Sequence, residues 1–247
     1  MHRNTIAFVI VAAIAGFIGG FWLANSINRS ALNSPSSQKT SATSADISNS
    51  RPNAETDLTA DELRSKIAEA DKNPTNLAYQ KDLGTALYRY AAMKQNVDLL
   101  MESVRILERA SSINGQDFDV SVALGNAHFD IGFATKNASE YQKARDIYAK
   151  ALEIKPTDAD VHTDLGLTYF LQDPPIYDKA AAELQRVSDA NPNHQRSLQF
   201  LVQVLVKQNK LAEAEKALAK LTAINPANSA VAELTSQISA AKSGPNK

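Results

Sequence analysis

The chain has 247 residues with 26 basic and 27 acidic side chains, a formal net charge of −1, and no cysteine. This balance of charge gives no general attraction to nucleic acid or to anionic lipid. The lack of cysteine excludes disulfides, thiol nucleophiles and thiolate metal sites, but it does not indicate a redox compartment.

The first element in chain order is an apolar segment, Ile6–Ala24, which contains no charged residue. As a helix it would be about 28 Å long, close to the hydrocarbon thickness of a bilayer. We therefore expect residues 1–24 to form a transmembrane anchor in contact with the lipid bilayer through residues 6–24. The alternative is a cleaved signal peptide, but the apolar run exceeds the usual signal core and no small-x-small cleavage site follows Trp22.

The short tail before this segment carries Arg3, which favours a cytoplasmic tail. This orientation predicts a single-pass protein of the inner (plasma) membrane with its remaining domain in the periplasm or another extracytoplasmic space. Ala12, Gly16 and Gly20 share one face of the segment, a small-xxx-small pattern that supports dimers in lipid. A homodimer is therefore an open possibility.

Residues 25–57 form a different kind of segment, rich in Ser, Asn and Thr, with Pro35 and Pro52 and no aromatic residue. Such a composition cannot bury enough apolar surface to fold. We expect a flexible linker with a root-mean-square span of about 30 Å.

The rest of the chain repeats one unit. The pairs Leu83-Gly84, Leu124-Gly125 and Leu165-Gly166 recur at intervals of 41 residues, and Leu201-Val202 follows 36 residues later. Each unit ends on a helix stop, because Pro or Gly does not comfortably continue a helix. These stops are Asn73-Pro74, Asn114-Gly115, Lys155-Pro156, Asn191-Pro192 and Asn225-Pro226.

Apolar residues at three-and-four spacing predict two amphipathic helices between successive stops. We expect helices at about 76–93 and 97–113, then at about 117–134 and 138–154, whereas a Pro-Pro loop at 172–176 breaks the third unit. Before the first unit, Thr59 and Glu62 predict the capping box of an additional helix. After the last unit, Val231, Leu234 and Ile238 predict a terminal helix with one apolar stripe.

Small residues indicate where the helices approach closely. Gly84, Gly125 and Gly166 lie on first helices at positions where a larger side chain would hold neighbouring helices apart. Large residues of the second helices, such as Leu107 and Tyr148, fill the remaining gaps.

This pattern resembles the tetratricopeptide repeat (TPR) family, whose motif combines Leu-Gly, Tyr, Ala, an aromatic residue, Ala and a closing Pro. The third unit matches at Leu165-Gly166, Tyr169, Tyr177, Ala180, Leu184, Val187 and Pro192. The first unit is the weakest match, since Ser103 and Gly115 replace the alanine and the proline. The resemblance implies an all-α fold for residues 58–242, a right-handed α-solenoid of about four TPR helix pairs with capping helices, followed by a disordered tail at 243–247.

The family binds peptides or partner helices along the first helices, on the concave side of the solenoid. Carried over by motif, this implies a peptide groove lined by Lys81, Tyr88, Arg89, Asn126, Phe129, Leu167, Phe170, Arg196, Gln199 and Gln203. The alternative is that Phe129, Leu167 and Phe170 complete the core. Asp160 and Asp164 stand where family members that clamp chaperone carboxylates have basic residues, so a hydrophobic peptide or an unfolded segment is the better ligand.

Catalytic motifs are missing from the sequence. It contains no P-loop, no Gly-x-Ser-x-Gly elbow and no His-Glu-x-x-His pair. His128 and His162 lie on successive first helices without an evident third ligand, so we expect packed or solvated histidines rather than a metal site. The sequence thus predicts a non-enzyme with no cofactor, no metal and no nucleic-acid partner.

Together these features predict a membrane-anchored TPR scaffold that binds protein partners. The arrangement of span, linker and repeats is similar to that of anchored TPR subunits in cytochrome c maturation or at the secretion translocon, which implies assembly or biogenesis of envelope proteins. Three alternatives remain: a structural organiser that self-associates, a secreted TPR protein with a cleaved signal peptide, and an enzyme accessory module.

Overall fold

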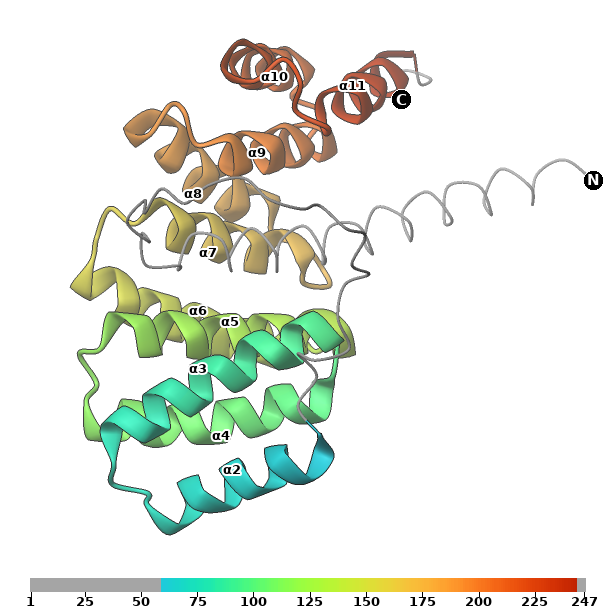
Figure 1. Ribbon diagram of the computed structural model, residues 1–247. Coiled ribbons are helices and arrows are strands. Elements are labelled where there is room, and N and C mark those ends of the chain that lie inside the picture. The colour runs from blue at the N-terminus through green and yellow to red at the C-terminus, as the bar shows by residue number, and fades with distance from the viewer. Residues whose placement is uncertain (1–58, 244–247) are drawn as a thin grey trace, which may run out of the picture.

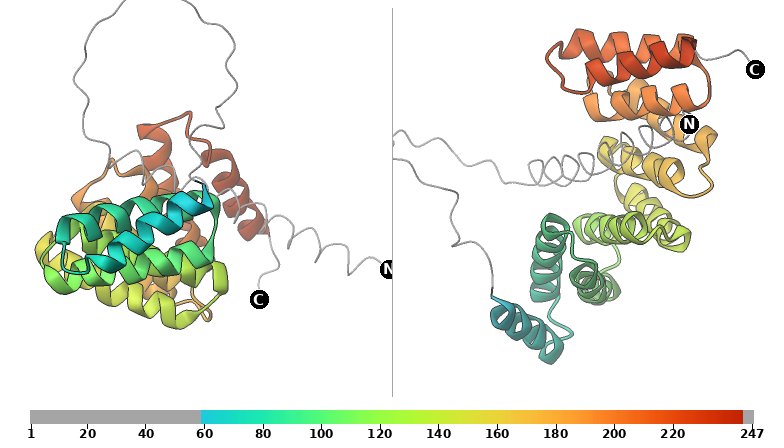
Figure 2. Two further views of the ribbon diagram at one scale, coloured as in Figure 1. Left: turned by 60° about the horizontal axis from the view of Figure 1, so that its bottom comes forward. Right: turned by 90° about the vertical axis from the view of Figure 1, so that its right-hand side faces the viewer.

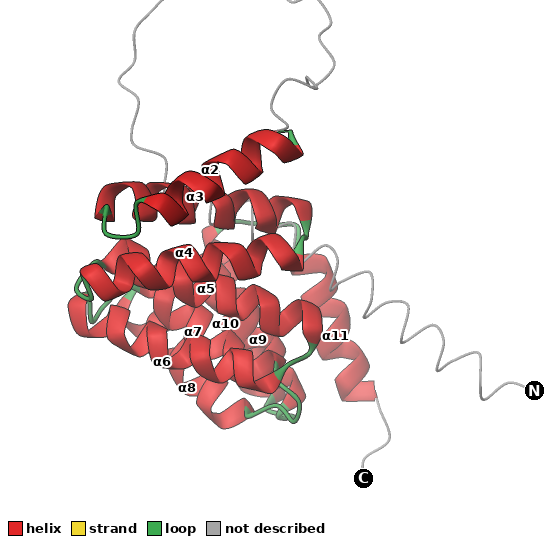
Figure 3. Ribbon diagram, turned by 90° about the horizontal axis from the view of Figure 1, so that it is seen from below, coloured by secondary structure: helices red, strands yellow, loops and turns green. Residues whose placement is uncertain are grey.

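The computed structural model describes residues 59–243, in which every regular element is an α-helix (Figures 1 and 3). The predicted anchor at 6–24, the linker at 25–57 and the last four residues lie outside this range. Within it, no helix is both long enough and apolar enough to cross a membrane. The ten helices of the described range are α2 (Ala60–Lys72), α3 (Leu77–Lys94), α4 (Val97–Ile113), α5 (Phe118–Thr135), α6 (Ala138–Ile154), α7 (Ala159–Leu171), α8 (Tyr177–Ala190), α9 (Gln195–Lys207), α10 (Leu211–Ile224) and α11 (Val231–Ser243).

The helices stack in chain order as four antiparallel pairs, α3/α4, α5/α6, α7/α8 and α9/α10, with α2 and α11 at the two ends (Figures 1 and 2). The first helices of successive pairs also contact one another, from α3 through α5, α7 and α9 to α11. No two second helices of the described range are in comparable contact. The first helices therefore form the inner layer of the stack, and we call their surface the inner face.

Local sequence signals place the helix boundaries where the repeat pattern predicted them. The side chains of Asn76, Asn96, Asp117, Asn137 and Asp158 each accept a hydrogen bond from a backbone N–H of the helix that follows. At the start of α2 the predicted capping box is present, because the Thr59 N–H donates to Glu62 Oε2 (2.9 Å) and the Glu62 N–H donates to Thr59 Oγ1 (3.2 Å).

The turns within the pairs are of two kinds. Gln95, Lys136 and Asn209 adopt left-handed backbone conformations, with φ of 54°, 54° and 59°, and so reverse the chain within three of the pairs. The third pair differs as expected: α7 ends at Leu171, and the Pro-Pro loop separates it from α8.

The core of the described residues falls into three clusters along the stack. A small cluster joins α2 to α3 and α4 around Ala70, Leu87 and Ile106. A second spans α3, α4 and α5, and the largest runs from α5 to α11, where Leu234 and Ile238 complete it. The side chains of α5 belong to both larger clusters, so this helix connects the two parts of the core.

Close approach within the pairs depends on the three glycines of the Leu-Gly motif. A Cβ atom built on Gly125 would lie 2.6 Å from Cε1 of Tyr148, and one on Gly84 would lie 2.8 Å from Cγ of Leu107. The corresponding distance for Gly166 is 3.2 Å, to Cγ of Leu184. These contacts confirm that the glycines mark the points where the helices of a pair nearly touch.

The two end helices are attached differently. In α2, the carbonyl of Ala70 accepts a buried hydrogen bond from Gln80 Nε2 (2.7 Å), and Asp71 pairs with Arg105 (2.5 Å) and Arg109 (2.6 Å) of α4. In α11, Leu234 and Ile238 are buried as the apolar stripe predicted. Both ends of the described stack therefore present polar outer surfaces.

We predict that Gly125→Leu destabilises the fold by about 1–3 kcal/mol, because the new side chain must displace the Tyr148 ring. Gly115→Leu is the matched control, since a Cβ there meets nothing closer than 3.6 Å and the position is exposed. Thermal melting followed by circular dichroism measures both. Equal melting temperatures for the two variants would contradict the assigned helix contact.

Candidate functional site

Five of the ten predicted groove residues are buried, and three of these, Asn126, Phe129 and Leu167, pack within their own pair or in the core rather than line an open groove. The exposed fractions of Asn126, Phe129 and Leu167 are 5%, 1% and 0%. Phe129 packs edge-on against Tyr141, with ring centroids 5.7 Å apart, and the Tyr148 hydroxyl donates to Asn126 Oδ1 (2.7 Å). The expectation that these three side chains face a partner is therefore wrong, because they face the second helix of their own pair or the core. For Phe129 and Leu167 this agrees with the alternative that these residues complete the core.

Two of the three predicted groove residues of α3, Lys81 and Tyr88, instead contact residues at the start of and within the neighbouring first helix, α5. Lys81 Nζ donates to Asp117 Oδ2 (2.8 Å) and to Asp119 Oδ2 (3.2 Å), and the Tyr88 hydroxyl donates to Asp130 Oδ2 (3.1 Å). Burial opposes ionisation of Asp117, but the Lys81 ammonium and the Val120 N–H outweigh it and lower the pKa of that carboxyl group. The inner face is thus bridged by polar contacts between α3 and α5.

A second set of bridges joins α7 to α9. Arg196 forms a buried ion pair with Asp164 and lies 3.8 Å from Asp160, which is also 3.2 Å from His194 Nε2. The two aspartates found at the expected clamp positions are therefore partnered within the chain. Gln199 is likewise engaged, because its Nε2 donates to Asn228 Oδ1 (2.9 Å) in the segment before α11.

The other three predicted residues, Arg89, Phe170 and Gln203, remain at least partly exposed. Within residues 59–243 the side chains of Arg89 and Gln203 have no hydrogen-bond or ion-pair partner. Phe170 contacts the Tyr177 ring at a centroid distance of 6.1 Å. Phe170 and Gln203 come from α7 and α9, which lie in contact, whereas Arg89 is on α3.

Neighbouring positions of α7 and α9 carry further side chains that are not fully buried. Leu171 and Val206 are partly buried against the core, and Lys207 is exposed without a carboxylate partner in the described chain. Val206 was missed at the sequence level, although it lies 36 residues after Phe170, the spacing of the last two repeats. We call Phe170, Leu171, Gln203, Val206 and Lys207 the α7–α9 surface.

The two helix histidines pair with carboxylates rather than with each other. His128 Nδ1 lies 2.7 Å from Glu140 Oε2, and His162 Nδ1 lies 2.8 Å from Glu183 Oε2. Both pairs join the first helix of a repeat to its second helix. Across the described residues no three His, Asp or Glu side chains are arranged to hold a metal ion.

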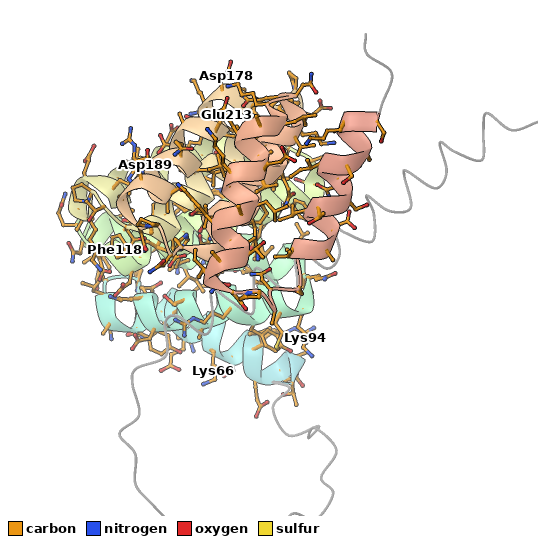
Figure 4. All side chains as sticks on the ribbon, turned by 90° about the horizontal axis from the view of Figure 1, so that it is seen from above. Lys66, Lys94, Phe118, Asp178, Asp189 and Glu213 are labelled. Atoms are coloured by element: carbon orange, nitrogen blue, oxygen red, sulfur yellow. The ribbon has the colours of Figure 1, made fainter. Side chains whose placement is uncertain are left out.

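Polar side chains cover the outer side of the stack. Figure 4 looks onto the C-terminal end, where Asp178 and Glu213 lie near each other and Asp189 lies apart from them, at the other end of α8. All three are exposed. Within residues 59–243 the large apolar side chains that are well exposed are Met93, Met101 and Ile113.

Comparison with known proteins supports the repeat assignment. Residues 177–238, which hold α8, α9, α10 and the first part of α11, match the tetratricopeptide repeat family. The crystal structure of MamA is 20% identical, with a TM-score of 0.54, and the match covers 67% of this chain and 87% of that one. MamA from Desulfovibrio magneticus RS-1 is 18% identical over 68% of this chain and 86% of its own, also with a TM-score of 0.54.

A thermophilic TPR protein from Thermus thermophilus is 17% identical, with a TM-score of 0.51, and the match covers 73% of this chain and 89% of that protein. At these identities the likeness shows a shared fold, a TPR-like α-solenoid. No curated protein matches the chain in sequence.

We predict that Asp164→Asn destabilises the fold by about 3–5 kcal/mol, because it removes the buried carboxylate that pairs directly with Arg196 and leaves only the more exposed Asp160, 3.8 Å away. The side chains of Asp164 and Arg196 are only 4% and 9% exposed. Asp61→Asn is the control, since its pair with Arg64 is almost fully exposed. Denaturant unfolding measures both, and a loss below about 1 kcal/mol for Asp164→Asn would contradict a structural role for the buried pair.

Proposed function

We propose that the chain is a TPR-type scaffold that binds a protein partner at the α7–α9 surface. The observation that carries the proposal is the division of the inner face. Between α3 and α5 its polar side chains bridge neighbouring repeats, whereas Phe170, Gln203 and Lys207 remain accessible on two helices in contact. The family match at residues 177–238 supports it, since those residues include α9.

The chemistry of this surface favours an apolar peptide segment. Phe170, Leu171 and Val206 offer apolar area, and the Gln203 amide provides a donor and an acceptor for a peptide backbone. Lys207 lies in the last turn of α9 and offers a positive charge at the edge of the surface. An extended or helical segment with an apolar anchor and an acidic flank fits this arrangement.

The proposal includes membrane attachment. Residues 6–24 act as a retained anchor, and the repeats lie on the extracytoplasmic side of the inner membrane, where they serve the assembly of envelope proteins, as in cytochrome c maturation. The support is the uncharged apolar run and the positions of Arg3 and the linker in the sequence. Self-association through Ala12, Gly16 and Gly20 stays a prediction from sequence.

Photo-crosslinking tests the binding surface. A crosslinking residue placed at Phe170 or at Gln203 in the membrane-bound protein is expected to capture a defined partner, whereas one at Met101 is not. Met101 is the matched control because it is 52% exposed on α4, outside the inner face. Equal capture from all three positions, or none from Phe170 and Gln203, would exclude this surface.

With a peptide from the captured partner, we predict that Phe170→Ala weakens binding about thirtyfold, the usual loss when an anchoring aromatic is removed. Gln203→Ala should weaken it less, and Met101→Ala should not change it. Phe129→Ala, in contrast, should lower the melting temperature because its ring is in the core. Undiminished affinity of a folded Phe170→Ala protein would refute the role of this ring.

Membrane attachment has its own test. We predict that the protein stays in the membrane pellet after carbonate washing and that its mature N-terminus is Met1 or His2. N-terminal sequencing and fractionation measure this outcome. A soluble product that starts near Asn25 would instead establish the cleaved signal peptide.

A further inference from the structure

His162 has a hydrogen-bond acceptor at each of its two ring nitrogens. Nδ1 lies 2.8 Å from Glu183 Oε2, and Nε2 lies 3.0 Å from the carbonyl oxygen of Pro156. The histidine side chain is only 7% exposed, and that of Glu183 is 19% exposed. A carbonyl oxygen cannot donate, so Nε2 must carry a proton, and the short contact with the carboxylate needs a second proton.

The two contacts of His162 therefore require two protons. A neutral imidazole ring beside an ionised carboxylate group supplies only one. If the second proton resides on Nδ1, the ring is an imidazolium; if it resides on Oε2, the carboxyl group is neutral. In both cases the pair holds one proton more than the neutral ring with an ionised glutamate. Without that proton, the Nδ1 lone pair faces the carboxylate oxygen with no hydrogen between them.

His194 provides a contrast within the same region. Its Nδ1 accepts a hydrogen bond from the Ser197 N–H (3.3 Å), and its Nε2 lies 3.2 Å from Asp160 Oδ1. A neutral ring with its proton on Nε2 satisfies both contacts. The requirement for an additional proton is thus specific to the geometry of His162.

The other charged groups on the elements packed against α7 have partners of their own or act only weakly. On α8, Arg186 lies 4.0 Å from Glu183 and opposes the positive charge on His162. On α9, Arg196 is paired with Asp164. On α6, Arg145 donates to Gln172, and Lys155, the residue after α6, lies over the Phe118 ring. On α5, His128 pairs with Glu140.

We propose that His162 is a proton-dependent latch that holds α7 to α8 and to the turn between α6 and α7. With the additional proton, the ring donates to Glu183 of α8 and to Pro156 of the turn. When that proton leaves to solvent, one of the two contacts is lost and a part-buried acceptor loses its hydrogen bond to the ring. The third repeat then opens more readily, in the middle of the stack.

The direction of the pH dependence follows from the same contacts. The hydrogen bond to Glu183 raises the pKa of His162 above its ordinary value, against the opposing effect of burial, and the Pro156 carbonyl raises it further. The stabilisation is therefore complete below about pH 6.5, the unfolded value, and is lost as the pH rises through the higher folded pKa. The latch does not depend on the identity of any partner.

Glu183→Gln separates this mechanism from ordinary packing. The glutamine amide can donate to the Nδ1 lone pair of a neutral ring, while Nε2–H still donates to Pro156, so the variant needs no additional proton. We expect the full-length wild type in detergent to lose melting temperature between pH 6.5 and pH 9, and Glu183→Gln to lose less. The variant should be less stable than wild type at pH 6 and at least as stable at pH 9. His194→Gln is the control and should keep the wild-type loss.

A histidine-labelled NMR titration of the wild-type protein gives an independent reading that does not depend on the variant folding. A His162 pKa above 6.5 supports the latch, and a value at or below 6.5 overturns it. A constant stability difference between wild type and Glu183→Gln across the pH range also overturns it. Faster amide exchange in α7 and α8 than in α9 and α10 as the pH rises, after correction for the intrinsic rate, would locate the opening.

Discussion

The close approach of two helices at a single glycine is the contact on which the rest of the stack depends. At Gly125 the Tyr148 ring lies over the helix backbone, and this position also lets the Tyr148 hydroxyl reach Asn126. The pair thus becomes one rigid unit whose outer surfaces meet the next pair. The fourth pair lacks the glycine: Val202 is fully buried there, and Leu218 of its second helix is only partly buried.

The helices could be predicted because their signals are local. A capping residue, an apolar spacing and an Asn-Pro stop act within a few residues of one another, so sequence alone placed the boundaries of α3 to α6 within about one residue of the structure.

The groove could not be predicted in the same way. Repeat register indicates on which face a side chain lies, but it does not identify its partner, which is often one repeat away. Lys81 and Asp117 are 36 residues apart, and Asp164 and Arg196 are 32 apart. From sequence, Lys81 and Arg196 were interpreted as ligand-binding residues and Asp164 as a charge that opposes a carboxylate ligand, whereas in the structure each forms a bridge within the chain.

Polar bridges join neighbouring first helices at two places on the inner face, between α3 and α5 and between α7 and α9. Buried ion pairs contribute little net stability, since desolvation offsets most of their attraction, but a wrong partner leaves a charge unpaired. The pair between Asp164 and Arg196 therefore selects the correct stacking of α7 on α9 more than it strengthens it. The bonds of Lys81 and Tyr88 act similarly between α3 and α5. The proposed α7–α9 surface lies on the same two helices as the bridge between Asp164 and Arg196.

The position of α5 in two hydrophobic clusters determines how the molecule can come apart. Twelve of its eighteen residues are buried, from Val120 to Gly132, and they are covered by α3 and α4 on one side and by α6 and α7 on the other. Loss of the N-terminal helices leaves α5 as the end of the larger cluster, and loss of the C-terminal helices leaves it as the end of the smaller one. The stack thus behaves as two cooperative blocks that share one helix rather than as a series of equal repeats. Repeats added or removed at either end would change the length of the stack. An insertion within α5 would instead separate the two hydrophobic clusters that this helix joins.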